Sequence, residues 1–227
     1  MSLPTVIIVT GTDTGVGKTT TTAAIATVLA AAGRRISVYK PCQSGASEGD
    51  SDCAQIYRLA GPMHASAGVV LGAALAPAAA AALEDAALPP VSVHADRIRA
   101  FARNSDHVLV EGSGGLLVGL DEAGRTLADL AELLGAQAGC VVVSRPGLGT
   151  LNHTALTLEA LQRRGIRVLG VVLGTWPVEP GAADDHNRRA FGDGPVPLLG
   201  VLPTGAGALP PAVFRQRAGG WLPGVAA

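Results

Sequence analysis

The feature that most constrains this chain lies near its beginning, where a short apolar run leads into a glycine-rich loop and then into an alanine-rich segment. The apolar run covers residues 5–10, the loop reads GTDTGVGKT over 11–19, and the alanine-rich segment ends before Gly33. A strand, a glycine loop and a helix in this order are the context of a phosphate-binding P-loop. The sequence therefore predicts a nucleotide-binding α/β protein.

Residues of this loop have separate predicted roles, because peptide N–H groups at a helix N-terminus surround phosphate while side chains supply charge and metal ligation. We expect the side chain of Lys18 to reach the β and γ oxygens and the Thr19 hydroxyl to ligate Mg²⁺. The nucleotide-binding residues expected here are Gly15, Val16, Gly17, Lys18, Thr19 and Thr20. The loop departs from the usual spacing by one residue, since Thr12 stands where the first glycine is expected.

Short apolar runs alternate with helical segments along the whole chain, which is typical of an α/β fold with a mostly parallel sheet and helices on both faces. The strands expected are 5–10, 36–40, 107–111, 140–144, 168–173 and 198–202. The helices expected are 19–32, 126–134 with a capping box of Thr126 and Asp129, 151–164, and three with weaker signals near 52–60, 93–102 and 182–191. The Ala-rich stretch 73–87, interrupted by Pro77, is read as a loop and a short helix, and the Pro- and Gly-rich tail from Gly205 has no assignment.

Composition excludes several classes of function. The 227 residues are 48% hydrophobic and 15% charged with a net charge of −1, so we expect one folded domain over 1–227 and no nucleic-acid-binding face. The three cysteines form no CxxC pair, which favours a reducing cytoplasm over a disulfide scaffold or a structural zinc site. No basic leader precedes the first apolar run, and no run approaches the ~20 residues of a membrane span, so we expect neither secretion nor membrane insertion.

The use of basic residues singles out two positions. Of 17 basic residues only Lys18 and Lys40 are lysines. A compact ammonium can enter a narrow phosphate site that the planar guanidinium of arginine does not fit. Both lysines are therefore candidates for phosphate chemistry.

Two carboxylates are candidates for the metal site that Thr19 begins. Glu111 ends the third apolar run, and the carboxyl edge of a parallel sheet is where open α/β folds place their ligands. Asp52 begins a predicted helix after an acidic segment, so a simple N-terminal helix charge is a competing interpretation for it. The residues alone thus predict a Mg²⁺-dependent nucleoside triphosphatase.

Four segments in order make the prediction more specific: GTDTGVGKT at 11–19, KPCQSG at 40–45, EGSGG at 111–115 and GLGTLNH at 147–153. Together they resemble the dethiobiotin synthetase family across nearly the whole chain. The resemblance implies a homodimeric P-loop enzyme that converts 7,8-diaminononanoate, CO₂ or bicarbonate as its source, and MgATP into dethiobiotin, ADP and phosphate. The family's reaction passes through a carbamate and a carbamic-phosphoric anhydride before the ureido ring closes.

Site residues follow from the resemblance position by position. It implies that Lys18, Lys40 and Thr14 serve the transferring phosphoryl group and that Ser44 binds substrate. The segment Thr150, Leu151 and Asn152 is implied to bind the substrate carboxylate of the other subunit, although Thr150 is also read as an ordinary N-cap. Further nucleotide contacts are implied at Gly112, Ser113, Gly114, Gly174, Thr175 and Pro203.

One departure from the family pattern concerns the nucleobase. Where many members carry an Asn-Asp pair that reads adenine, this chain has Gly174 and Thr175 followed by Trp176. ATP is therefore the family default, and backbone groups at Gly174 and near Pro203 are the remaining candidates for base contact.

Two other functions remain as alternatives. A partition-type regulatory ATPase would share the P-loop, but this chain has Thr12 and Asp13 where such switches commonly have an extra lysine, and it ends GGWLPGVAA instead of in a basic amphipathic helix. A cobyrinate-type amide ligase would share GVGKT but usually needs a glutaminase domain, for which there is no spare length.

Overall fold

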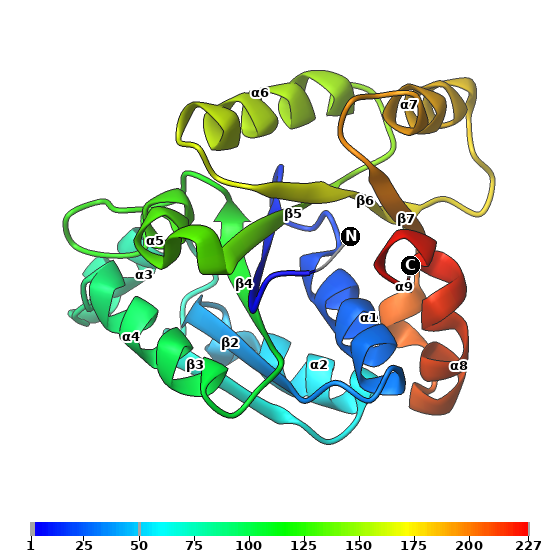
Figure 1. Cartoon of the computed structure of the whole chain (residues 1–227). Helices are drawn as coiled ribbons and strands as arrows, with labels where there is room; N and C mark the ends of the chain where they lie inside the picture. The colour runs from blue at the N-terminus through cyan, green and yellow to red at the C-terminus, as the bar shows by residue number, and fades with distance from the viewer. Residues whose placement is uncertain (1–2, 50, 227) are drawn as a thin grey trace.

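A single seven-stranded parallel sheet organises the chain in the computed structural model, which describes residues 3–49 and 51–226 (Figure 1). Its strand order is β3-β2-β4-β1-β5-β6-β7. The strands are β1 Val6–Gly11, β2 Ile36–Gln43, β3 His64–Val70, β4 His107–Gly115, β5 Ala138–Ser144, β6 Val168–Trp176 and β7 Leu198–Pro203. The predicted α/β class is confirmed, and all six predicted strands are present, with β2, β4 and β6 three or four residues longer at the carboxyl end.

Strand β3 is the element that the six-strand prediction missed. Its sequence HASAGVV contains small residues and no continuous apolar run, and it lies at the edge of the sheet with partly exposed side chains. An edge strand that buries little surface needs no apolar pattern, so the periodicity gave no signal for it.

Strand β2 continues through Pro41, which a central strand would not tolerate because proline has no N–H for the ladder. The pairing of β2 with β4 ends at Tyr39 opposite Val110, whereas its pairing with β3 continues to Gln43 opposite Val70. Pro41 therefore lies where β2 has a partner on one side only, and this extension carries Gln43 to the site.

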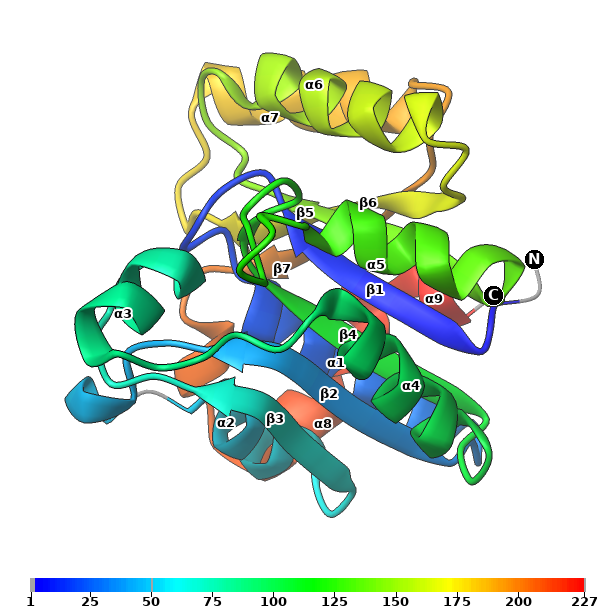
Figure 2. The ribbon, with the colours of Figure 1, turned by 90° about the vertical axis from the view of Figure 1, so that its left-hand side faces the viewer.

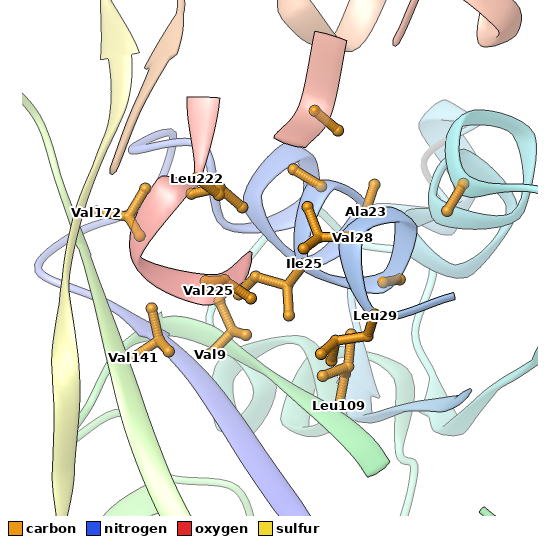
Figure 3. Packing of buried hydrophobic residues seen from close by; sticks show 14 of the residues in the cluster. Val9, Ala23, Ile25, Val28, Leu29, Leu109, Val141, Val172, Leu222 and Val225 are labelled. Atoms are coloured by element: carbon orange, nitrogen blue, oxygen red, sulfur yellow. The ribbon is translucent and has the colours of Figure 1, made fainter. Parts of the chain in front are cut away.

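Helices cover both faces of the sheet (Figure 2). On one face α1 Lys18–Ala31, α2 Asp52–Ala60, α8 Pro211–Trp221 and α9 Pro223–Ala226 enclose a core that includes Val9, Ile25 and Leu109 (Figure 3). The other face is covered by α3 Pro77–Glu84, α4 Val91–Ala102, α5 Leu127–Leu134, α6 Thr150–Arg163 and α7 Ala182–Gly192. Helices thus cover both faces, as predicted for a parallel sheet.

Local signals behave as expected at several helix ends. Thr126 and Asp129 form the predicted capping box at the start of α5. Pro77 begins α3 at its first position, as a proline can where no intrahelical N–H is needed.

The tail that had no assignment forms the 3₁₀ turn η3 Ala206–Ala208, then α8 and α9. Phe214 and Leu222 are fully buried in the same core as α1. Gly219 and Gly220 lie inside α8, and their low helix propensity hid this helix from the sequence pattern.

Within the described residues, no helix has the length and apolar character needed to cross a membrane.

Candidate active site

The phosphate loop takes its shape from two glycines and from a close approach of another strand. Gly15 and Gly17 have φ angles of +73° and +96°, a region that side chains disfavour. A Cβ on Gly17 would lie 2.6 Å from the carbonyl oxygen of Gly174, so glycine is required at Gly17 for space as well. Gly174 is thus a packing partner of the loop, and a Cβ there would lie 2.1 Å from the Val16 carbonyl oxygen.

The unusual spacing of the loop has a structural explanation at Thr12. Its N–H donates to the carbonyl of Val143 at 3.0 Å, which continues the pairing of β1 with β5 by one residue. Among the described residues Asp85 is the one non-glycine with positive φ, so Thr12 has a backbone that any residue can adopt. A glycine is not needed there.

Three oxygen-bearing side chains from distant parts of the sequence meet beside the loop. The Thr19 hydroxyl lies 2.8 Å from Asp52 Oδ1 and 2.8 Å from Glu111 Oε1. Glu111 comes from β4, Asp52 from the first turn of α2 and Thr19 from the first turn of α1. The structure therefore brings the three predicted metal-site residues together, and Asp52 points inward.

Lys40 lies between the same two carboxylates. Its Nζ is 2.5 Å from Asp52 Oδ2 and 3.1 Å from Glu111 Oε1, and its residue is 4% exposed. Burial alone would lower the pKa of this ammonium, but the negative charges of Glu111 and Asp52 outweigh burial and raise it. Lys40 is a permanent cation in this site.

Lys18 approaches from the loop side. It is 8% exposed, and its Nζ donates to the carbonyl oxygen of Asp13 at 2.9 Å. Burial lowers the pKa of Lys18, and the positive charge of Lys40 acts in the same direction, although Glu111 counteracts both. Two buried cations thus share one region, which favours anionic ligands there.

Asp13 also connects the loop to the segment after β5, a connection that the sequence did not reveal. One carboxylate oxygen of Asp13 accepts the Thr14 N–H at 2.7 Å, and the other forms an ion pair with Arg145. Thr14 is thus held at the tip of the loop by a residue whose other contact lies 132 positions away.

A cavity of about 760 Å³ opens over these groups. Its polar wall includes predicted site residues Thr14, Gly15, Gly17, Lys18, Thr19, Thr20, Lys40, Ser44, Asp52, Glu111, Ser113, Gly114 and Thr175. Its apolar wall was not predicted and is formed by Ala74, Leu75, Ala76, Pro77 and Val118. Figure 2 shows α3, which begins at Pro77, at the same end of the sheet as the loop after β1. The Ala-rich composition of 73–87 was the one sequence signal for this wall.

Hydrogen bonds hold the strand ends that line the cavity. Gln43 donates to the Ser44 carbonyl at 2.7 Å and accepts the Asp52 N–H at 3.0 Å, so Gln43 orients the start of α2. Ser113 donates to the carbonyl of Cys42 at 2.5 Å. Cys42 itself is fully buried, and burial raises the pKa of its thiol to about 11, which does not favour a nucleophilic thiolate.

Several predicted residues lie outside the cavity of this chain. Gly112 follows Glu111 on β4, and its carbonyl lies 3.5 Å from Lys40 Nζ, but the residue is not part of the cavity wall. Pro203 ends β7 opposite Trp176 and is not part of the cavity wall.

The start of α6 also lies outside the cavity wall. Gly149 is the N-cap of α6, so the interpretation of Thr150 as an ordinary N-cap is wrong. Thr150 is buried, and its hydroxyl has no hydrogen-bond partner. Leu151 and Asn152 are exposed at the start of this helix.

The donor set near Thr19 fits Mg²⁺. Glu111 is fully buried and its Oε2 has no hydrogen-bond partner, which leaves one oxygen free for a cation. Hydroxyl and carboxylate oxygens are the ligands that Mg²⁺ prefers, with phosphate and water completing its shell. Within the described ranges no cluster of three His, Cys, Asp or Glu side chains could hold a metal.

Comparison with known sequences identifies close relatives. Residues 5–210 match the family model described as "AAA domain". ATP-dependent dethiobiotin synthetase BioD of Mycobacterium avium is 47% identical over 216 residues, which cover 95% of this chain and 94% of the relative. The enzyme of the same name from Mycolicibacterium smegmatis is 49% identical over 93% of this chain and 92% of its own length.

Solved structures show the same fold at low sequence identity. The septum site-determining protein MinD of Pyrococcus horikoshii, complexed with Mg-ADP, superposes with a TM-score of 0.60 at 18% identity, covering 99% of this chain and 95% of that protein. At this identity the likeness is one of fold.

Proposed function

The chain belongs to the dethiobiotin synthetase family, and we propose that its cavity carboxylates 7,8-diaminononanoate and closes the ureido ring at the expense of ATP. One amine takes up CO₂ and loses a proton to form a carbamate. A carbamate oxygen then attacks the γ-phosphorus of ATP, ADP leaves, and a carbamic-phosphoric anhydride remains. The second amine attacks the carbamoyl carbon and expels phosphate, which gives dethiobiotin.

The observation that supports this proposal best is the placement of the two lysines. Lys18 and Lys40 both line the cavity from different elements, and both are buried. Phosphoryl transfer is mainly positioning and stabilisation of charge, so two fixed cations around the γ-phosphoryl group suit this step. Thr14 lies at the loop tip, where its hydroxyl can hydrogen-bond the phosphoryl group or the carbamate.

Magnesium would be held by Thr19, Asp52 and Glu111. When bound it neutralises charge on the nucleotide phosphates during transfer.

The apolar wall fits the hydrocarbon chain of the diamine. Leu75 is 47% exposed, and together with Pro77 and Val118 it offers a surface that water solvates poorly. Ser44 lines the same cavity, and its hydroxyl can bind an amine.

We propose a homodimer in which α6 of one chain completes the site of the other. The first turn of α6 holds Thr150, Leu151 and Asn152, and the start of a helix binds carboxylates through its N–H groups. The Thr150 N–H already donates to the Gly147 carbonyl at 3.3 Å, so Leu151 and Asn152 would supply the N–H groups. Leu148, just before α6, and Leu156, within it, are 86% and 57% exposed and add apolar surface to this side of the molecule. The chain would act as one synthetase domain over 1–227, and its free cysteines are compatible with the cytoplasm.

The proposal also includes contacts with the nucleobase. Thr175 lines the cavity, whereas Gly174 packs against the phosphate loop at Val16 and Gly17, and Pro203 is not part of the cavity wall. Peptide groups at this end would contact the base, and ATP is the nucleotide expected.

Phosphate release in a single turnover is the decisive experiment. We expect release from MgATP to require the diamine and bicarbonate together, with dethiobiotin formed in equal amount. Turnover that is independent of the diamine, or that increases on addition of DNA or of a protein partner, would contradict the proposal and favour a regulatory ATPase.

A further inference from the structure

The helix that begins with Asp52 also holds the turn that follows β7. Gln55 Nε2 donates to the carbonyl oxygen of Gly207 at 2.7 Å. Arg58 donates to the same oxygen at 2.5 Å and to the Leu209 carbonyl at 3.2 Å. Arg58 Nε also donates to Gln55 Oε1 at 3.0 Å, so each side chain orients the other.

This turn lies against the start of α1. A Cβ on Gly207 would be 2.9 Å from the hydroxyl oxygen of Thr20, and Ala206 is buried in the core below. Thr20 lines the cavity, so the turn lies against a residue of the cavity wall. The turn also follows the carboxyl end of a parallel strand, where α/β sheets bind ligands.

The direction of a bound nucleotide decides what the turn can contact. Lys40 lies on β2 and Ser44 directly follows it, on one side of β1 and its phosphate loop in the strand order. Thr175 on β6 and the turn after β7 lie on the other side of β1. If the γ-phosphoryl group meets the diamine beside Lys40 and Ser44, the nucleoside extends in the other direction, past Thr20 and Thr175.

We propose that Gln55 and Arg58 are positioning residues that fix the turn 204–209 so that its peptide groups contact the nucleoside. This inference rests on the proposed function, because it assumes that the phosphate loop binds a nucleoside triphosphate. Three donors on two carbonyls hold a glycine-containing turn in one conformation, and recognition by peptide groups needs such a fixed backbone. Gln55 and Arg58, which hold the turn, lie on the same helix as Asp52, the proposed metal ligand. One helix therefore positions both the turn and this ligand.

The test separates nucleoside contacts from phosphate contacts. Calorimetry would measure the affinities of MgATP and of Mg-tripolyphosphate, which lacks the nucleoside, for the full chain and for the Gln55→Met/Arg58→Met double variant. Methionine keeps side-chain length and helix propensity while removing the donors. We expect the Kd of MgATP to rise about tenfold, since one lost charge-assisted contact is worth roughly that factor, and the Kd of Mg-tripolyphosphate to stay within about twofold.

Arg99→Met is the matched control. Arg99 also donates to a backbone carbonyl, that of Leu133 at 2.6 Å, but it lies on α4 against the other face of the sheet. It should leave both affinities unchanged. Equal weakening of both ligands in the double variant, or weakening of neither, would overturn the inference. A wild-type chain that binds neither ligand would contradict the proposed function itself and remove the inference with it.

Discussion

Lys40 and Glu111 form a buried ion pair in which Nζ lies 3.1 Å from Oε1 and Glu111 has no exposed surface. Removing two charges from water is costly, and their attraction often does no more than offset that cost. The pair is therefore weak evidence for a stabilising role. It is better explained by a site that requires a cation beside the phosphate and a carboxylate beside the metal.

The first prediction concerns Lys40→Arg. The guanidinium is larger and planar and has no room between Asp52 Oδ2 and Glu111 Oε1, so it should not reach the γ-phosphoryl group in the same position. Turnover should fall by about 10³-fold or more, the range seen for cations in phosphoryl transfer, while MgATP still binds through the loop. Lys18→Arg should weaken nucleotide binding itself. Calorimetry and single-turnover phosphate release distinguish the two, and near-normal turnover in Lys40→Arg would refute its catalytic role.

The second prediction concerns the free oxygen of Glu111. Glu111→Gln keeps the shape of the side chain but removes the charge beside Thr19 and Lys40. We expect the magnesium concentration needed for half-maximal turnover to rise at least about tenfold, because Mg²⁺ loses a charged oxygen ligand. Glu132→Gln, at a half-exposed ion pair with Arg164, is the control and should leave this magnesium concentration unchanged. An unaltered magnesium requirement in Glu111→Gln would remove Glu111 from the metal site.

The site shows where sequence reasoning succeeds and where it stops. The phosphate loop, Lys40 and Glu111 were predicted because each stands beside a strong local pattern, a glycine loop or the end of an apolar strand. Asp52 could be placed in the first turn of a helix, but its contact with Thr19 depends on how that helix packs. The pattern did not reveal the apolar wall or the contact between Asp13 and Arg145, because both join segments with no shared periodicity.

The same limit applies to the fold. Strands buried on both faces were predictable from continuous apolar runs, and the capping box from Thr126 and Asp129, which are three positions apart. Strand β3 and helix α8 contain small residues and glycines, and tertiary contacts decide their conformation.

The third prediction concerns Asp13 and Arg145. Both side chains are about half exposed, 53% and 44%, so their pair should contribute little to folding stability. Its effect should be on the loop: Arg145→Gln leaves the Asp13 carboxylate uncompensated beside the phosphates and should weaken MgATP binding severalfold. In an Asp13→Asn background the same substitution should have little further effect. Arg163→Gln, which breaks an exposed pair with Glu159 on α6, is the control. Additive effects of the two substitutions would show that Arg145 acts directly on a ligand.

The fourth prediction concerns pH and the buried His94, which shares a hydrogen bond of 2.7 Å with Tyr39. Burial lowers the pKa of His94 from 6.5 to about 4, with a further contribution from Arg97. Between these values the unfolded chain binds a proton that the folded chain does not, so the free energy of unfolding rises with pH in this window. The difference amounts to at most about 3 kcal/mol. Urea unfolding would measure the free energy of unfolding at several pH values from 4 to 7. This free energy should rise less with pH in His94→Gln than in the wild type, and an equal rise in both would contradict a neutral buried imidazole.

The last prediction tests the shared active site by mixing two defective chains. Lys40→Arg damages the phosphoryl side of a site, whereas Asn152→Asp puts a negative charge at the helix end that should bind the substrate carboxylate of the partner. Each homodimer should be nearly inactive. In a twofold dimer with shared sites, a mixed dimer has one site with both defects and one with neither. Equal mixing after subunit exchange should therefore restore about a quarter of the wild-type turnover.

Mixing Lys40→Arg with Glu111→Gln, at a magnesium concentration too low for turnover by the Glu111→Gln homodimer, provides the control for this experiment. Both residues line the same cavity of one chain, so every site in that mixed dimer keeps one defect and no activity should return. Recovery in this control would mean that the chains compensate in some way other than sharing a site. Absence of recovery with Asn152→Asp, when sedimentation shows that mixed dimers have formed, would mean that α6 serves its own chain or no substrate at all.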